Sequence, residues 1–227
     1  TSDKCYQSNN SKVGFLEDDK LGGEDPYSGS KASAEIIANT YYNSFFKNKK
    51  NCGVSTARAG NVIGGGDWSQ NRLIPDCIRS IMKKKTIVLR NPYFNRPWQH
   101  VLEPLYGYLV LAKNLYKNPM KFSGPWNFGS KKNTVTDVLT VVKQIIRKWG
   151  YGKVNFLKKV KYYEQENLQL NIQKTARILK WKPKWTIKKS IYKTVDWYKD
   201  FLVLNLKAEN ITKKQIQEYI NDIKKKN

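Results

Sequence analysis

Short apolar segments alternate along this chain with longer segments of helical spacing, and no other feature limits the fold as much. Gly53–Ala59 is typical of a buried strand, because small and β-branched residues follow a glycine there. Apolar residues at helical spacing predict helices over Leu73–Lys84, Leu105–Tyr116 and Thr136–Trp149. Strands that alternate with helices indicate an α/β architecture.

The same reasoning predicts further elements along the chain. Strands are expected at Thr86–Leu89, Trp126–Gly129 and Val154–Leu157, and helices at Ala32–Phe46, Gln173–Leu179, Ile187–Phe201 and Thr212–Lys226. The apolar side of the first of these helices is expected to comprise Ala34, Ile37, Ala38, Tyr41 and Phe45.

Composition narrows the class of protein. The 227 residues suffice for one or two cores, and 42 Lys and Arg against 18 Asp and Glu give a net charge of +24. Such a charge fits either a solvated basic surface or a polyanion site, and the dispersal of lysines among asparagines favours the solvated surface. We therefore expect no nucleic-acid partner. The chain starts with Thr, so we also expect an N-terminal part to precede it.

Cysteine usage and hydropathy indicate a compartment. Cys5, Cys52 and Cys77 are scattered without metal-ligand spacing, which is typical of reduced thiols in a cytoplasm. With a single histidine, a zinc site is not expected. No run of ~18 apolar residues is present, so no membrane span is predicted.

A predicted helix N-terminus that carries candidate catalytic residues follows a polar loop. Asp25 suits the N-cap and Pro26 the first helical position. Tyr27 and Lys31, four residues apart, lie on one face near the helix N-terminus. A phenol ionises near pH ~10, and an adjacent ammonium at a helix N-terminus favours the phenolate, a usable base. The alternative is an ordinary Tyr and Lys on a helix surface.

Two other segments are candidates for a functional site, one because polar side chains are consecutive in it and the other because it is rich in glycine. Ser2, Asp3 and Lys4 place a hydroxyl, a carboxylate and an ammonium in consecutive positions, which indicates either chemistry or a simple turn at a strand end. Gly60–Trp68 is glycine-rich but lacks the G-x-G-x-x-G dinucleotide pattern. It fits a tight turn with positive φ, or backbone that lies against a ligand.

The Pro-rich segment Arg90–Val101 resembles a phosphate clamp. The guanidinium group of an arginine such as Arg96 can donate two parallel hydrogen bonds to phosphate oxygens. Trp98 is expected to be exposed beside the arginines of this segment. His100 is interpreted as a structural hydrogen-bonding residue rather than a catalyst.

Taken together, these motifs resemble the extended short-chain dehydrogenase/reductases that modify nucleotide sugars, most closely the CDP-glucose 4,6-dehydratases. The segments that carry the resemblance are Thr1-Ser2-Asp3-Lys4-Cys5-Tyr6, Asp25-Pro26-Tyr27-Ser28 with Ser30-Lys31, Ala57 to Trp68, Arg72 to Asp76, Arg96 to Val101, Trp126 to Gly129 and Thr194 to Tyr198. The segments span almost the whole chain. The Gly-Gly-Gly-Asp-Trp and Arg-Pro-Trp-Gln-His-Val blocks are the most specific.

The resemblance implies a partial NAD-binding Rossmann domain with a parallel sheet and a smaller C-terminal mixed α/β substrate domain. Residues 1–62 and 94–120 would belong to the Rossmann domain, and residues 63–93 and 121–227 mainly to the substrate domain. The family's N-terminal half, with its Gly-rich turn, is absent from this sequence. Two smaller departures are Tyr163-Glu164-Gln165, where a His-Glu-Ala-like segment is expected, and Asn171, where relatives tend to carry Asp.

The resemblance also implies site roles. Tyr27 and Lys31 would act in catalysis and bind NAD, with Tyr27 the base for the sugar C4 hydroxyl and Lys31 its partner and a ribose ligand. Ser2 would hydrogen-bond the C4 oxygen, Asp3 would protonate the departing C6 hydroxyl, and Lys4, in its neutral form, would remove the C5 proton. The substrate pyrophosphate would contact Asn61, Arg72, Arg96 and Asn127.

The implied activity is dehydration of CDP-glucose by an NAD-dependent homodimer or higher homo-oligomer in the cytoplasm. Three alternatives remain open at this point: another nucleotide-sugar 4,6-dehydratase or 4-epimerase, an inactive fragment, and a basic polyanion-binding module. The Asp3-Lys4 pair speaks against an epimerase, which needs no acid–base pair for elimination.

Overall fold

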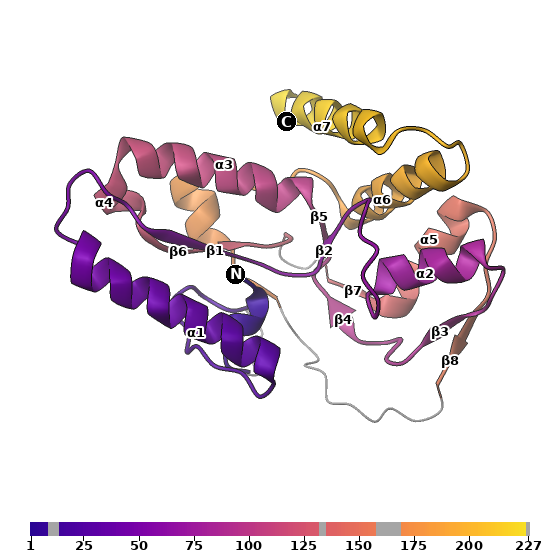
Figure 1. Ribbon diagram of the computed structural model, residues 1–227, viewed down its shortest axis with the longest axis horizontal. Helices are drawn as coiled ribbons and strands as arrows, with labels where there is room; N and C mark the ends of the chain where they lie inside the picture. The colour runs from indigo at the N-terminus through magenta and orange to yellow at the C-terminus, as the bar shows by residue number, and fades with distance from the viewer. Residues whose placement is uncertain (9–13, 132–134, 158–168, 226–227) are drawn as a thin grey trace. The chain divides into compact units, whose positions relative to one another are not determined.

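The computed structural model describes residues 1–8, 14–131, 135–157 and 169–225 (Figure 1). The chain forms two compact units, each assembled from three separate stretches. The first unit comprises residues 1–61, 103–135 and 167–183, and the second comprises residues 62–102, 136–166 and 184–227. The departure at Tyr163-Glu164-Gln165 lies outside the described residues.

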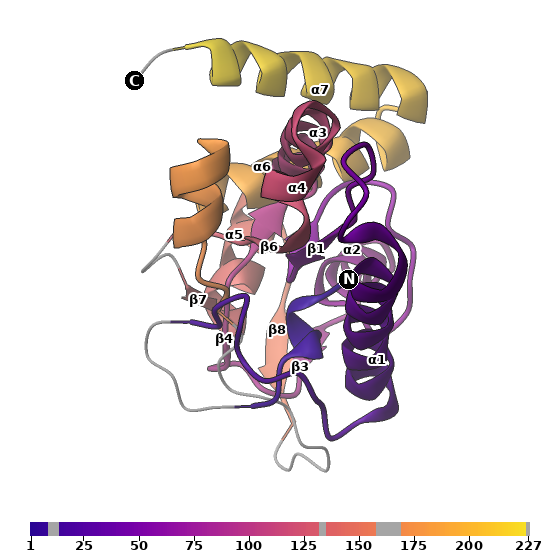
Figure 2. The ribbon, with the colours of Figure 1, turned by 90° about the vertical axis from the view of Figure 1, so that its left-hand side faces the viewer.

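The first unit is built on two parallel strands with a helix on either side. Its elements are η1 (Asp3–Cys5), α1 (Pro26–Tyr41), η2 (Tyr42–Phe46), β1 (Ser55–Ala59), α3 (Leu102–Lys117), α4 (Pro119–Phe122), β6 (Gly124–Phe128) and η3 (Thr175–Leu179). β1 and β6 pair in parallel with Ala57 opposite Trp126 and Arg58 opposite Asn127. Figures 1 and 2 show α1 and α3 on opposite sides of this strand pair.

The two faces of the strand pair differ in chemistry, because side chains alternate along a strand. Phe128 faces α3, where its ring lies edge-on to Tyr108 at 5.2 Å and to Trp181 of the first unit at 5.1 Å. A β-carbon on Gly107 of α3 would lie 2.4 Å from the Phe128 ring, so only glycine lets α3 approach β6 this closely. The opposite face carries Arg58 and Asn127, both buried.

Helix α1 begins as the sequence predicts. The Asp25 carboxylate accepts a hydrogen bond from the Ser28 backbone N–H at 3.0 Å, and Pro26 occupies the first helical turn. The prediction that the apolar side of this helix is buried is wrong, because Ile37, Tyr41 and Phe45 are each more than half exposed.

The buried face of α1 is instead formed by Ser28, Ala32 and Glu35. The strand side chains that bond Glu35 are Thr56 and Arg58, which are polar, so this face of the helix buries small and polar residues. The α-helix also ends earlier than expected, at Tyr41, and continues as the π-helical segment η2.

The second unit carries the larger apolar core. Its elements are β2 (Val62–Ile63), α2 (Leu73–Met82), β3 (Ile87–Leu89), β4 (Asn95–Arg96), β5 (Gln99–His100), β7 (Thr136–Asp137), α5 (Val138–Trp149), β8 (Val154–Phe156), α6 (Ile187–Leu202) and α7 (Ala208–Lys224). β2 pairs in parallel with β5, β3 pairs in parallel with β8, and β4 pairs antiparallel with β7. The chain is therefore an α/β protein, and three of the four strand pairs among the residues described above are parallel.

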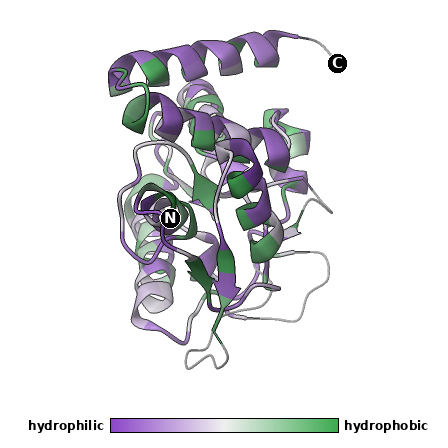
Figure 3. Cartoon of the chain, turned by 90° about the vertical axis from the view of Figure 1, so that its right-hand side faces the viewer, coloured by the Kyte–Doolittle hydropathy of each residue, from purple (hydrophilic) through white to green (hydrophobic). Residues whose placement is uncertain are grey.

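Helices α5 and α6 supply the centre of this core. The side chains of Val142, Ile145, Ile191 and Val195 are fully buried. Helix α7 is far more hydrophilic, as its mostly purple ribbon shows (Figure 3), and only one narrow stripe that includes Ile211 and Tyr219 is buried. No helix in the described ranges combines the length and apolar content that a membrane crossing requires.

The segment Arg90–Val101 differs from the expected exposed loop. It contains β4 and β5, and Trp98 is buried at 9% exposure. His100 is 1% exposed, which agrees with a structural role for the imidazole. The three cysteines are free, and burial raises the pKa of Cys5 and Cys77 to about 12.

The two compact units do not coincide with the expected domain bounds. Residues 121–135 pack in the first unit, because β6 pairs with β1. Residues 94–102 pack in the second unit, where β5 pairs with β2 and β4 with β7. The ligands of each domain are not identified by this division, so the assignment of cofactor and substrate domains stays a prediction.

Candidate functional site

The Ser2-Asp3-Lys4 segment forms a 3₁₀ turn at the end of a strand-like stretch. Ser2 forms a parallel bridge to Ala59 and caps η1, where its Oγ accepts from the Lys4 backbone N–H at 3.2 Å. The same hydroxyl donates to Asp3 Oδ1 at 2.9 Å. Ser2 and Asp3 are buried at 7% and 3% exposure. The segment is thus the predicted strand-end turn, and the Ser2 and Asp3 side chains are hydrogen-bonded to each other within it.

The end of β1 lies directly against Asp3. A β-carbon on Gly60 would come within 1.8 Å of Asp3 Oδ2, so no other residue type fits there without displacing the carboxylate. Asn61 donates from Nδ2 to the same oxygen at 3.1 Å, and Asn61 itself adopts a left-handed φ of +50°. Asn61, predicted as a substrate ligand, is therefore in contact with a predicted catalytic carboxylate.

Tyr27 and Lys31 lie together on the first turns of α1. The Lys31 ammonium sits 5.3 Å from the centre of the Tyr27 ring, which is cation–π contact range. The Tyr27 side chain is 52% exposed, so its hydroxyl is accessible to a ligand. This confirms the predicted spacing on one helix face.

Packing between α1 and η1 brings the two predicted catalytic groups to one region of the first unit. Lys4 interacts with the helix cap: hydrogen bonds from Ser28 lower the pKa of Asp25, and the Lys4 charge lowers it further. The arrangement gathers a phenol, a hydroxyl, a carboxylate and two ammonium groups.

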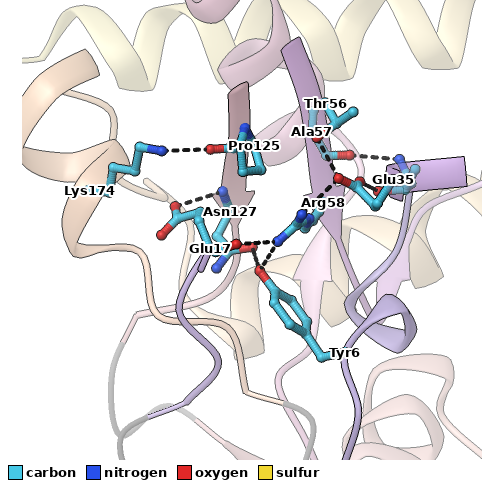
Figure 4. A network of polar contacts seen from close by, with 10 residues as sticks. Tyr6, Glu17, Glu35, Thr56, Ala57, Arg58, Pro125, Asn127 and Lys174 are labelled. Carbon is cyan, nitrogen blue, oxygen red and sulfur yellow. Dashed lines mark hydrogen bonds and ion pairs between the residues drawn. The ribbon is translucent and has the colours of Figure 1, made fainter. Parts of the chain in front are cut away.

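Behind this region lies a buried polar network that sequence reasoning missed (Figure 4). Arg58 donates from Nη1 to the Tyr6 hydroxyl at 2.7 Å and from Nη2 to Glu35 Oε2 at 2.8 Å. The same Nη1 reaches the Glu17 carbonyl at 2.8 Å. Burial raises the pKa of Tyr6 above its usual range, so its hydroxyl stays protonated and donates to Asn127 Oδ1 at 2.8 Å.

Asn127 differs from its expected role as a substrate ligand. It is fully buried, and its Nδ2 donates to the Phe15 carbonyl at 2.9 Å and to the Asn171 carbonyl at 3.2 Å. Its Oδ1 accepts from Tyr6. With the side-chain amide occupied by protein groups, Asn127 braces the loops that carry Phe15 and Asn171.

The two predicted substrate arginines belong to the second unit. Arg72 stands at the N-cap of α2, with a side chain that is 64% exposed and 3.9 Å from Asp67 Oδ2. Arg96 lies on β4, where its guanidinium stacks 5.4 Å from the Phe94 ring centre and donates to the Asn95 carbonyl at 2.9 Å.

The glycine-rich segment packs against protein side chains. A β-carbon on Gly65 would lie 2.0 Å from Trp197, and one on Gly64 would lie 2.7 Å from Val101. Gly66 has a positive φ of +81°. These glycines allow a turn and close packing within the second unit. This agrees with the first of the two predicted alternatives, a tight turn, rather than backbone that lies against a ligand.

Comparison with known proteins identifies the relationship. No family model matches the sequence. The chain is 39% identical over 229 residues to the CDP-glucose 4,6-dehydratase of Salmonella typhimurium. The chain is a homologue of that dehydratase. The match covers 97% of this chain and 63% of the Salmonella protein, so the homologue spans less than two thirds of its relative's length.

Solved structures support the same fold. The dehydratase homologue superimposes on dTDP-glucose 4,6-dehydratase from Bacillus anthracis, solved in complex with NAD, with a TM-score of 0.73 and 26% identity. That match covers 91% of this chain and 63% of the other. A UDP-galactose 4-epimerase matches with a TM-score of 0.69 and 18% identity, which shows the fold alone.

Proposed function

We propose that the protein catalyses the NAD-dependent dehydration of CDP-glucose to CDP-4-dehydro-6-deoxyglucose. The observation that supports this most is the packing of the Ser2-Asp3-Lys4 turn against the helix that carries Tyr27 and Lys31. The 39% identity to a CDP-glucose 4,6-dehydratase supports the choice of substrate. Because the chain spans 63% of that relative, the activity is assigned to the full-length protein.

Tyr27 acts as the base for the sugar C4 hydroxyl. Its ring lies beside the Lys31 ammonium on the first turns of α1, which places a cation next to the group that accepts the proton. Ser2 donates a hydrogen bond to the C4 oxygen and steadies the carbonyl that forms there. The carbonyl in turn acidifies the C5 proton.

Asp3 and Lys4 perform the elimination across C5 and C6. Lys4 removes the C5 proton, while Asp3 gives a proton to the departing C6 hydroxyl, so water is lost. The hydrogen bond from Asn61 holds the Asp3 carboxyl in a fixed orientation for this transfer, while the single hydroxyl hydrogen of Ser2 turns from Asp3 to the sugar C4 oxygen.

The residues present fit the nicotinamide-ribose end of NAD. An exposed phenol beside an ammonium offers a hydroxyl and a cation to ribose hydroxyls, and the two groups stand one helical turn apart. When bound, NAD supplies the hydride acceptor and donor for the sugar. Tyr27 and Lys31 would hold it at the ribose.

The substrate pyrophosphate is proposed to contact Asn61, Arg72 and Arg96. A dianionic group needs paired positive charge and directional donors, and these side chains provide them. Part of the +24 net charge would also draw in an anionic substrate.

A nucleotide-sugar 4-epimerase is the second candidate, because epimerase structures share the fold. An epimerase would use Tyr27 and Lys31 but would need neither Asp3 nor Lys4. Incubation of the full-length protein with CDP-glucose and NAD separates the two reactions. A 4-keto-6-deoxy product, detected by its absorbance in alkali, supports the dehydratase, and a product altered only in C4 configuration supports the epimerase.

Replacement of Tyr27 by Phe is expected to lower kcat at least about a hundredfold, because the base that starts the reaction is lost. The measurement is the initial rate of 4-keto product formation at saturating CDP-glucose. Tyr116→Phe is the matched control, since Tyr116 is 90% exposed at the far end of α3 and its hydroxyl should not matter. Unchanged turnover in Tyr27→Phe would refute the assignment.

A further inference from the structure

A carboxylate that no predicted role explains lies behind the catalytic turn. Glu35 follows Tyr27 and Lys31 on α1 at successive steps of four residues, so the three residues share one side of the helix. Glu35 is 3% exposed. A buried carboxylate is unfavourable unless other groups pair with it, so its contacts indicate what it does.

The two oxygens of Glu35 bind different parts of the first unit. Oε1 accepts a short hydrogen bond from the Thr1 hydroxyl. Oε2 accepts from the Thr56 hydroxyl at 2.6 Å and from Arg58 at 2.8 Å, both on β1 (Figure 4). One oxygen therefore anchors the carboxylate in the sheet, and the other holds the residue directly before Ser2.

The charge of Glu35 is retained in this setting. Burial alone would raise the pKa of its carboxyl, but hydrogen bonds from Arg58, Thr1 and Thr56 outweigh burial and lower it. The carboxylate thus stays an acceptor for the Thr1 hydroxyl at neutral pH.

A second restraint acts further along the same segment. The Thr1 nitrogen donates to the Ala57 carbonyl at 2.7 Å, and Asp3 is held by Gly60 and Asn61 beyond the end of β1. The Glu35 contact ties this segment to a side chain of the helix that carries Tyr27 and Lys31.

We propose that Glu35 is a positioning residue, which fixes Ser2 and Asp3 relative to Tyr27 by holding Thr1 on the catalytic helix. The role rests on the proposed dehydratase function. A displacement of about 1 Å between reacting groups can lower a rate by up to about a hundredfold, so the restraint matters for kcat more than for binding.

Replacement of Glu35 itself would leave Arg58 buried without its partner, so the test uses its two threonine partners. Thr1→Val removes the hydroxyl held by Oε1, and Thr56→Val removes a hydroxyl held by Oε2. Both changes take one hydrogen bond from the same carboxylate, and each is expected to lower the melting temperature by about 2–4 °C. Only Thr1→Val frees the catalytic turn.

We expect Thr1→Val to lower kcat about tenfold with little change in KM, and Thr56→Val to leave kcat within about twofold of wild type. Thr1→Ser, which restores the hydroxyl, is expected to recover the lost rate. Equal kcat values in Thr1→Val and Thr56→Val would overturn the proposal.

Hydrogen exchange separates this proposal from the proposed function. If wild type forms no 4-keto product, the proposed function fails, and the positioning role is then decided by the backbone amides of Asp3–Cys5. Faster exchange of these amides in Thr1→Val than in Thr56→Val supports the restraint by Glu35. Equal exchange in the two variants overturns it.

Discussion

His100 is a neutral, buried imidazole that makes the fold sensitive to acid. Its Nδ1 accepts from the Leu102 backbone N–H at 3.3 Å, and its ring lies edge-on to Trp185 at 4.9 Å. Burial, together with the nearby Lys193 charge, lowers the pKa of His100 from 6.5 to about 3. Between these values the unfolded chain binds a proton that the folded chain does not, so stability falls as pH falls.

We predict that His100→Gln flattens this pH dependence. In the wild-type protein, His100 makes the free energy of unfolding about 2 kcal/mol smaller at about pH 5 than at neutral pH. The variant has no histidine, so this decrease is not expected in it. Urea denaturation at several pH values measures the difference between the two proteins. His100 is the only histidine in the sequence, so a parallel decline in both proteins down to about pH 5 would contradict the assignment.

Single residues were predictable where their chemistry depends on near neighbours. The Tyr27–Lys31 contact follows from helical spacing, and the Asp25 cap follows from the residue types. Glu35 and Arg58 were missed, because their importance comes from a contact between segments 23 residues apart. A signal was present: Arg58 interrupts an otherwise uncharged strand, and Glu35 lies one turn after Lys31.

Helix α5 shows how local signals define an element. The Asp137 carboxylate accepts from the Thr140 backbone N–H at 2.8 Å, and Gly150 ends the helix with a φ of +108°. Between these ends, Val141, Val142 and Ile145 are fully buried. The sequence contains the cap, the apolar stripe and the terminator, so the helix was predicted to within two residues.

We predict that Asp137→Ala destabilises the second unit by about 1 kcal/mol, because the Thr140 N–H loses its partner. Asp137→Asn is the matched control, since an asparagine oxygen caps a helix about as well. Thermal unfolding of both variants measures the effect. A loss of equal size in Asp137→Asn would show that the charge, and not the cap, is responsible.

Elements were less predictable where their partner decides which face is buried. The spacing in α1 marks Ile37, Tyr41 and Phe45 as an apolar side, yet this side is exposed. The strand contacts of α1 are polar, and this could not be inferred from the helix alone. Parallel pairing of β1 with β6 likewise depends on residues 69 positions apart.

At the scale of the whole molecule, the exposed apolar side of α1 is where we predict that the homodimer implied by the resemblance forms. Ile36, Ile37, Tyr41 and Phe45 are between 53% and 60% exposed, and the Tyr41 and Phe45 rings lie 5.6 Å apart. Adjacent apolar residues of this size are typical of an interface.

Ile37→Glu is therefore expected to weaken self-association at least about tenfold, because dimerisation would bury a charge. Light scattering over a range of protein concentrations measures the change in mass. Val203→Glu is the control, since Val203 is 57% exposed in the second unit. An unchanged mass for Ile37→Glu would exclude this side of α1 from the interface.

The ion pair between Glu35 and Arg58 also limits how this protein can diverge. The Glu35 side chain is only 2% exposed and the Arg58 side chain only 3%. Replacement of one of them alone would therefore leave the charge of the other uncompensated in the interior. Simultaneous replacement by apolar residues avoids that penalty. Descendants of this sequence are therefore constrained to keep both partners or exchange both at once, so each position determines which mutations the other tolerates.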